Sequence, residues 1–179
     1  MLHNEKELIE RITQGETELF AHIAEYYAQA VYVLIVRIVG NNEDAEELTQ
    51  DVLLRVFENL PYFNFKSSFS TWLYRIAYNE ALSHTRHHRE KLLELDERRV
   101  AQVSDKELDD WESSEREEEI ERLIGAIESL PSQDRALVTM VYYNDFSLKK
   151  CAEIIGQSEI NVKVKLHRIR KRLYLLVKS

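Results

Sequence analysis

The sequence predicts an all-α fold, made of two small helical domains joined by an acidic linker. Helix breakers are scarce, with four Gly and two Pro among 179 residues, and helix-forming residues are abundant. Apolar residues recur at helical spacing in two blocks, which are separated by an acidic stretch that lacks this spacing. We expect the domains to span residues 1–91 and 117–179, with residues 92–116 as the linker.

The first block is expected to contain four helices, the second of which is buried at the centre. A short helix begins near Asn4 and is broken at Gly15, and a long helix then runs to about Val39. Apolar residues crowd most of the circumference of this long helix, which indicates a core position. Its longest apolar run, residues 28–38, contains two polar residues and is shorter than a membrane span, so no membrane insertion is expected.

The segment Gly40-Asn41-Asn42 ends the long helix and begins the next one. Glycine favours the left-handed backbone at a helix C-terminus, and asparagine is a favoured N-cap. Acidic residues then suit the positive end of a helix dipole, and the third helix reaches about Asn59. Residues 60–68 form a loop with three aromatic rings, after which Ser68 or Ser70 caps a fourth helix.

The linker is strongly acidic. Residues 91–130 contain 14 Asp and Glu against 6 Lys and Arg. This charge imbalance and the lack of apolar periodicity predict a tether over residues 95–114 that is partly helical or disordered. Trp111 is its one large apolar anchor.

The second block is expected to end in a helix-turn-helix. One helix ends near Leu130, and the next starts after Pro131, a suitable residue for a first turn. Two more run over residues 148–155 and 159–177, separated by Gly156, which can take the positive φ of a tight turn, and by Ser158 as a cap. The last helix has a packing stripe at helical spacing, formed by Val162, Leu166, Ile169, Leu173 and Leu176.

The C-terminal segment is cationic on an otherwise anionic chain. From Pro131 onward there are ten Lys and Arg and four Asp and Glu, whereas the whole chain has a net charge of −8. Two rows flank the packing stripe of the last helix, one of them Lys163, His167 and Lys171 and the other Ile160, Val164 and Arg168. Such a helix fits the major groove of duplex DNA, with its N-terminal part at the bases and its flanks at the phosphates.

Two motifs resemble the sigma factors of bacterial RNA polymerase. Residues 130–135, 147–156 and 162–173 resemble the fourth conserved region of that family. Residues 44–57 resemble the core-binding helix of the second region, and residues 69–79 resemble the promoter-opening helix that follows it. Because no counterparts of the first and third regions are evident, the chain resembles the extracytoplasmic-function (ECF) subgroup.

The resemblance implies three sets of site residues. Those that contact the coiled coil of the polymerase β′ subunit are Glu47, Leu48, Gln50, Asp51 and Phe57. Those that contact the −10 element are Phe63, Asn64, Phe65 and Lys66 in the loop and Asn79, His84 and Arg86 beyond it. Those that read the −35 element are Ser158, Asn161, Lys163, Val164, His167, Arg168 and Lys171.

The resemblance also implies the partners and the chemistry. Core polymerase, through its β′ coiled coil and β flap, promoter DNA and an anti-sigma factor are the expected partners. A sigma factor is a cytoplasmic initiation subunit without catalytic residues of its own, so we expect no cofactor and no metal. The single cysteine, Cys151, suits a reducing compartment and is interpreted as a packing residue.

Two other functions remain open on the residues alone. A stand-alone helix-turn-helix regulator would bind an operator without polymerase, but it leaves the motifs over residues 44–57 and 69–79 unexplained. A metal-dependent hydrolase could use His84, His87 and His88 with nearby carboxylates. His84 and His88 stand at i, i+4 and could share a metal, but no third ligand at a diagnostic spacing appears.

Overall fold

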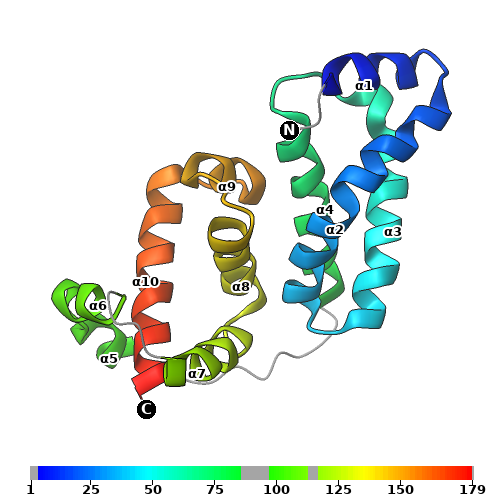
Figure 1. Ribbon diagram of the computed structural model, residues 1–179. Helices are drawn as coiled ribbons and strands as arrows, with labels where there is room; N and C mark the ends of the chain where they lie inside the picture. The colour runs from blue at the N-terminus through cyan, green and yellow to red at the C-terminus, as the bar shows by residue number, and fades with distance from the viewer. Residues whose placement is uncertain (1–3, 86–96, 113–116, 179) are drawn as a thin grey trace.

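Two helical bodies lie side by side in the computed structural model, which describes residues 4–85, 97–112 and 117–178 (Figure 1). Within these ranges every regular element is helical, as expected. The N-terminal domain contains α1 (Glu5–Thr13), η1 (Thr17–Leu19), α2 (Phe20–Val39), α3 (Asn42–Asn59), η2 (Leu60–Tyr62) and α4 (Phe69–Thr85). The expected domain boundary near residue 91 lies outside the described residues.

The linker and the C-terminal domain are also helical. The linker forms α5 (Glu97–Gln102) and α6 (Asp105–Glu112). The C-terminal domain contains α7 (Glu117–Glu128), α8 (Ser132–Val138), the π-helix η3 (Thr139–Tyr143), α9 (Leu148–Ile155) and α10 (Glu159–Lys178). The π-helix was not expected from the sequence, and its i→i+5 pattern continues to the bond from the Asn144 amide to the Thr139 carbonyl, 3.1 Å.

Helix α2 is the core of the N-terminal domain, where it packs against α3 and α4. Its side chains at Ile23, Val31 and Leu34 are fully buried. By length and composition the continuous helical stretch Thr17–Val39 is apolar enough to cross a membrane, and it is longer than the apolar run of residues 28–38. The buried side chains of this stretch, among them Ile35 and Ile38, lie at the centre of the domain core.

Local capping signals set the helix ends as the sequence predicts. Gly40 has φ 75° at the end of α2, and the Asn41 Oδ1 atom accepts a hydrogen bond from the Glu43 amide, 2.8 Å, at the start of α3. In the helix-turn-helix, Gly156 has φ 72° at the end of α9. The Ser158 Oγ atom accepts from the Asn161 amide, 3.2 Å, at the start of α10.

Helix α2 also contacts α8, so the two domains touch at the end of the central helix. The Arg135 guanidinium donates to the Arg37 carbonyl, 2.7 Å, and to the Ile38 carbonyl, 2.9 Å. It also donates to the Leu130 carbonyl in its own domain, 2.9 Å. A cation at a helix C-terminus meets the negative end of the dipole and satisfies carbonyls that have no partner inside the helix.

A second contact joins α4 to α9. The Arg75 Nε atom donates to the Glu153 carbonyl, 3.0 Å, and the Lys150 Nζ atom donates to the Ser70 hydroxyl, 3.0 Å. The rings of Tyr74 and Phe146 meet edge to face with centroids 4.8 Å apart. The domains therefore form a closed arrangement through both polar and aromatic contacts.

We predict that Asn41→Ala lowers the free energy of unfolding by about 0.5–2 kcal/mol, because the first amides of α3 lose their side-chain acceptor. Denaturant titration of the purified chain measures this change. Asn41→Asp keeps an acceptor at the same place and serves as the control. An Asn41→Ala variant as stable as the parent chain would contradict the capping role.

We predict slow modification of Cys151 by thiol reagents at neutral pH. Its side chain is fully buried, and desolvation by burial raises the pKa of the thiol to about 11 from its ordinary 9.0. Because the folded-state pKa is the higher one, the stability linked to this group is present below pH 9 and is lost as pH rises through 11. The rate of reaction with a disulfide reagent, followed by absorbance, should be fast only in denaturant. Fast reaction of the folded chain would contradict the burial of the Cys151 thiol.

Candidate functional site

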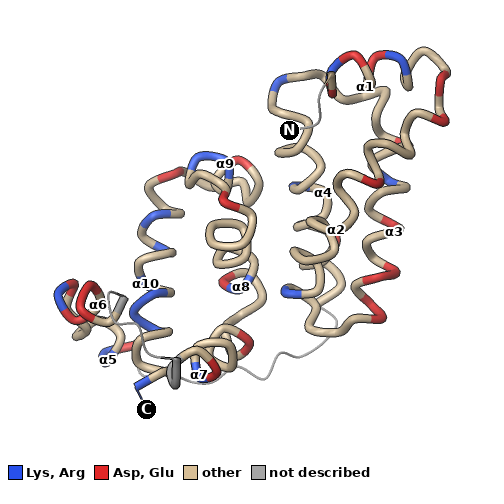
Figure 2. The backbone as a smooth tube through the Cα atoms, viewed as in Figure 1, with Lys and Arg blue, Asp and Glu red and all other residues tan. Residues whose placement is uncertain are grey.

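Helix α3 carries several acidic residues and lies on the side of the N-terminal domain away from the C-terminal domain (Figure 2). Three of its residues form an acidic strip. Glu47, Gln50 and Asp51 are exposed at spacings i, i+3 and i+4, so they share one face of the helix. Leu48, expected in the same set, is half-buried and packs against the core. The structure thus brings three of the predicted polymerase-binding residues together at the surface.

Phe57 lies at one edge of this strip, beside an apolar groove. The groove has a volume of about 390 Å³, and Phe20, Leu53 and Leu54 line it together with Phe57. Leu54 was missed in the sequence, although 56% of it is exposed in the structure. The available signal was its spacing, because it stands seven residues after Glu47 on the polar face.

The loop after α3 buries one of the two rings that were expected to contact the −10 element. Phe63 is only 8% exposed, and its ring centroid lies 5.1 Å from that of Trp72 and 5.6 Å from that of Phe69. Its ring therefore packs in the domain core, out of reach of a nucleic-acid base in this arrangement. Tyr62, at 80% exposed, is the ring that faces solvent here.

The tip of the loop is held in an uncommon backbone conformation. Phe65 has φ 57°, which is unusual for a bulky residue, and 44% of it is exposed. The Asn64 Oδ1 atom accepts from the Lys66 amide, 3.1 Å, which closes the turn. The Lys6 ammonium lies 5.7 Å from the centre of the Phe65 ring. Asn64 and Lys66 are both exposed.

The remaining −10 residues lie on or beyond α4. Asn79 is exposed on this helix. The His84 Nε2 atom lies 3.9 Å from the Asp44 carboxylate on α3, an ion pair only when the imidazole is protonated. Arg86 lies outside the described residues.

The N-terminal turns of α10 form the exposed end of the helix-turn-helix. Asn161, Lys163 and Val164 are exposed there, and 64% of Val164 faces solvent. Ile160 is even more exposed, at 75%, and belongs to the same surface although it is absent from the predicted site set. The expected packing stripe is buried or half-buried on the opposite side.

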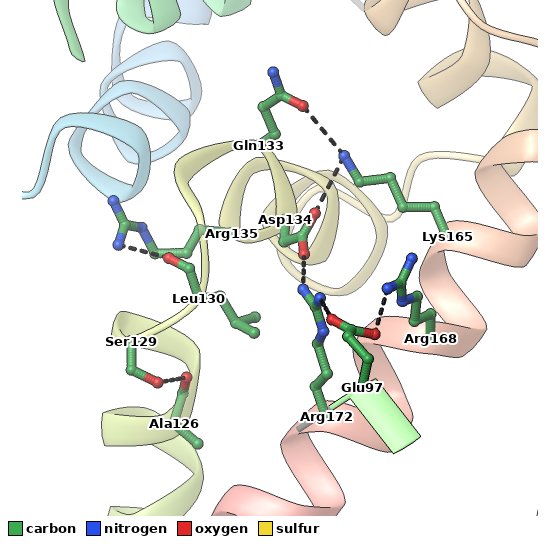
Figure 3. A network of polar contacts seen from close by, with 10 residues as sticks. All are labelled: Glu97, Ala126, Ser129, Leu130, Gln133, Asp134, Arg135, Lys165, Arg168 and Arg172. Carbon is green, nitrogen blue, oxygen red and sulfur yellow. Dashed lines mark hydrogen bonds and ion pairs between the residues drawn. The ribbon is translucent and has the colours of Figure 1, made fainter. Parts of the chain in front are cut away.

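The middle of α10 carries the other three predicted −35 residues, His167, Arg168 and Lys171, and each pairs with a carboxylate of the linker. Figure 3 shows the contact between Glu97 and Arg168. Glu97 on α5 accepts hydrogen bonds from Arg168 and Arg172, and these bonds hold the pKa of its carboxyl below the usual range. Asp105 on α6 lies 3.2 Å from the His167 Nε2 atom and 3.7 Å from the Lys171 Nζ atom.

Asp134 on α8 joins that helix to α10. Its carboxylate is only 6% exposed as a residue and lies 3.1 Å from the Lys165 Nζ atom and 3.3 Å from the Arg172 Nη1 atom. Figure 3 shows Arg172 between Asp134 and Glu97. A buried carboxylate needs such partners, because an unpaired charge loses its hydration. None of these pairs was predicted from the sequence.

The histidine cluster that could suggest a hydrolase is only partly described. His87 and His88 lie outside the described residues. Among those that the structure does describe, no group of three or more His, Cys, Asp or Glu side chains could hold a metal ion.

Comparison with known proteins gives the same two units. The family model for sigma-70 region 2 matches residues 23–91, and the model for sigma-70 region 4 matches residues 120–173. The ECF RNA polymerase sigma factor SigW of Bacillus subtilis is 30% identical, with 94% of each chain covered. The RNA polymerase sigma-H factor of Pseudomonas aeruginosa is 28% identical over 94% of this chain and 91% of its own.

Solved structures share the fold. CnrH, in complex with the cytosolic domain of CnrY, superimposes with a TM-score of 0.69 at 18% identity over 96% of this chain and 95% of its own. RpoE of Bartonella quintana, in complex with the anti-sigma factor NepR, gives 0.64 at 20% identity over 89% and 97%. With both regions in order and a full-length relative at 30% identity, this chain belongs to the ECF sigma factors of bacterial RNA polymerase.

Proposed function

We propose that the chain is a dissociable subunit that binds core polymerase through α3 and directs it to promoters by contacts with the −10 and −35 elements. The observation that carries this proposal is the exposed N-terminal end of α10 in a helix-turn-helix. Asn161 and Lys163 there are polar and open to solvent, and Ser158 caps the helix at its start. A helix end of this kind is what a major groove admits.

The −35 contact divides along α10. Asn161, Lys163 and Val164 belong to the end that enters the groove, where an amide, an ammonium group and an apolar side chain read base edges and thymine methyl groups. His167, Arg168 and Lys171 lie one to two turns further on and approach the phosphates.

The −10 contact uses the loop between η2 and α4. Phe65 and Asn64 are exposed at its tip and supply a stacking surface and a hydrogen-bonding amide for an unpaired base. Tyr62 extends this surface, whereas the buried ring of Phe63 supports the loop from the domain core. The strained φ of Phe65 is typical of loops whose shape serves binding.

The polymerase contact uses the strip of Glu47, Gln50 and Asp51 together with the exposed Leu54 and the Phe57 groove. An acidic helix with an apolar edge is complementary to a basic helical hairpin, the role of the β′ coiled coil. The C-terminal domain meets the β flap. The core enzyme supplies the bond chemistry, and this subunit works in the cytoplasm.

An anti-sigma factor completes the proposed set of partners. RpoE of Bartonella quintana, which shares the fold, was solved in complex with the anti-sigma factor NepR, and CnrH was solved in complex with the cytosolic domain of CnrY. The exposed faces of α3 and α10 are the surfaces that an inhibitor has to cover in order to block polymerase and promoter together.

We predict that the purified chain binds core polymerase lacking an initiation subunit and that Asp51→Lys weakens this binding at least about tenfold, or about 1.4 kcal/mol. The reversed charge repels a basic partner. Fluorescence titration with labelled core polymerase measures the change. Glu25→Lys on α2 reverses an exposed charge outside the strip and is the control. Failure of the parent chain to bind core polymerase would exclude the proposed function.

We predict that Lys163→Ala reduces transcription from −35-dependent promoters by an amount that corresponds to a free energy of about 1–3 kcal/mol, because the ammonium group is lost from the groove. Run-off transcription with core polymerase on a random promoter library identifies suitable promoters and measures the effect. Lys106→Ala on α6 removes an exposed ammonium group elsewhere and is the control. Promoter binding by the free chain as tight as with polymerase would favour a stand-alone regulator instead.

A further inference from the structure

The linker packs on α10 through apolar side chains as well as charges. Val100, Val103 and Leu108 are 2%, 5% and 2% exposed, although they come from a stretch that is mostly acidic. The Trp111 ring lies 5.8 Å from the Tyr174 ring of α10, edge to face. Both α5 and α6 contact α10, on the side away from the N-terminal domain (Figure 1). Residues 97–112 thus have a defined place on the C-terminal domain.

Helix α6 has a capping signal of its own. The Ser104 amide donates to the Glu107 carboxylate, 2.8 Å, and the Glu107 amide donates to the Ser104 hydroxyl, 3.2 Å. This reciprocal pair is a capping box. Asp105 stands directly after the cap, so the capping box also places its carboxylate near α10.

Three of the four partners of the linker carboxylates, namely His167, Arg168 and Lys171, are residues proposed to meet DNA phosphates. Glu97 takes hydrogen bonds from Arg168 and Arg172, one to each carboxylate oxygen. Asp105 is shared by His167 and Lys171. Arginine binds carboxylate and phosphate oxygens with the same planar donor geometry, so each linker carboxylate is a chemical substitute for a phosphate.

The linker covers one part of α10 and leaves the other open. The side chains of Lys171 and Arg172 are only 16% and 20% exposed. Lys163 and Val164, about two turns earlier, face solvent. The base-reading end is therefore accessible, whereas the charges that give a DNA complex most of its affinity are already neutralised.

We propose that α5 and α6 are an intramolecular ligand of the −35 surface, with Glu97 and Asp105 in the places of two DNA phosphates. The linker and the promoter then compete for the same cations, and the free chain binds duplex DNA only in the fraction of molecules whose linker has left α10. This inference rests on the proposed −35 contact of α10.

Competition of this kind is reversible. The ion pairs lie at the surface, and 51% of the Glu97 side chain and 77% of the Asp105 side chain are exposed, so each pair is weak and screened by salt. Their effect comes from the covalent attachment, which keeps the linker at a high effective concentration. Core polymerase, by holding the linker elsewhere, exposes the whole of α10 for the promoter.

The test compares two double variants in the full-length chain without polymerase. Glu97→Gln with Asp105→Asn removes the two contacts, and Asp109→Asn with Glu121→Gln removes two exposed charges that make no ion pair with α10 in the described part of the chain. Fluorescence anisotropy with a mixed-sequence duplex of about 20 base pairs at about 50 mM salt measures affinity. We expect the first variant to bind about tenfold tighter than the second. Equal affinities would overturn the proposal.

Hydrogen exchange of the unaltered chain gives a second readout that needs no substitution. Saturation with the same duplex should raise amide exchange over residues 97–112, because the linker leaves α10. Bound DNA without this increase would also overturn the proposal, because the linker and the duplex would then occupy α10 together.

Core polymerase separates this proposal from the function on which it rests. The contact-removing variant and the unaltered chain should give equal run-off transcription once polymerase has displaced the linker; a persistent tenfold difference would count against displacement. If no chain supports transcription with core polymerase, the proposed function fails, whereas the anisotropy comparison still decides whether the linker masks α10.

Discussion

The arrangement of the C-terminal half depends on how the positive charge of α10 is neutralised. This helix carries seven Lys and Arg residues and one acidic residue, Glu159. Carboxylates from three other elements meet these cations, namely Asp134 on α8, Glu97 on α5 and Asp105 on α6. Asp134 is buried and joins α8 to α10, whereas the linker carboxylates are exposed. The same type of ion pair thus joins two helices of the fold at one site and covers the proposed −35 surface at another, and the difference between the two is burial.

The two proposed binding faces are separated by the core of the molecule. The acidic strip on α3 lies at one side, α10 lies at the other, and α2 and α8 meet between them. Polymerase can therefore approach α3 while the domains are closed. The α4–α9 contact is different, because α4 also carries Asn79 and follows the −10 loop. Contact of α4 with promoter DNA along its length requires that α9 move away from Ser70 and Arg75.

The sequence predicts the elements well, because their signals are local. Gly40 marks the end of α2 and Asn41 marks the start of α3. Gly156 and Ser158 mark the end of α9 and the start of α10 in the same way. Pairings between distant residues carry no such signal. Glu97 and Arg168 are 71 positions apart. The sequence shows a glutamate in the same way whether its carboxylate is paired or solvated. In the loop, Tyr62 and Phe63 are adjacent aromatic residues, so only packing decides which ring is buried.

Arg135 belongs to both domains at once. Its bond to the Leu130 carbonyl stays within the C-terminal domain, whereas its bonds to Arg37 and Ile38 cross to the end of α2. Separation of the domains breaks only the crossing bonds, and water can replace a donor to each freed carbonyl, so the net change per bond is small. Arg135 thus supplies one part of the contact between the domains, beside the polar and aromatic contacts of α4 with α9. A substitution at this one position would remove both crossing bonds and leave the acidic strip on α3 and the N-terminal turns of α10 unaltered, so the hold between the domains can vary in evolution separately from the two proposed binding faces.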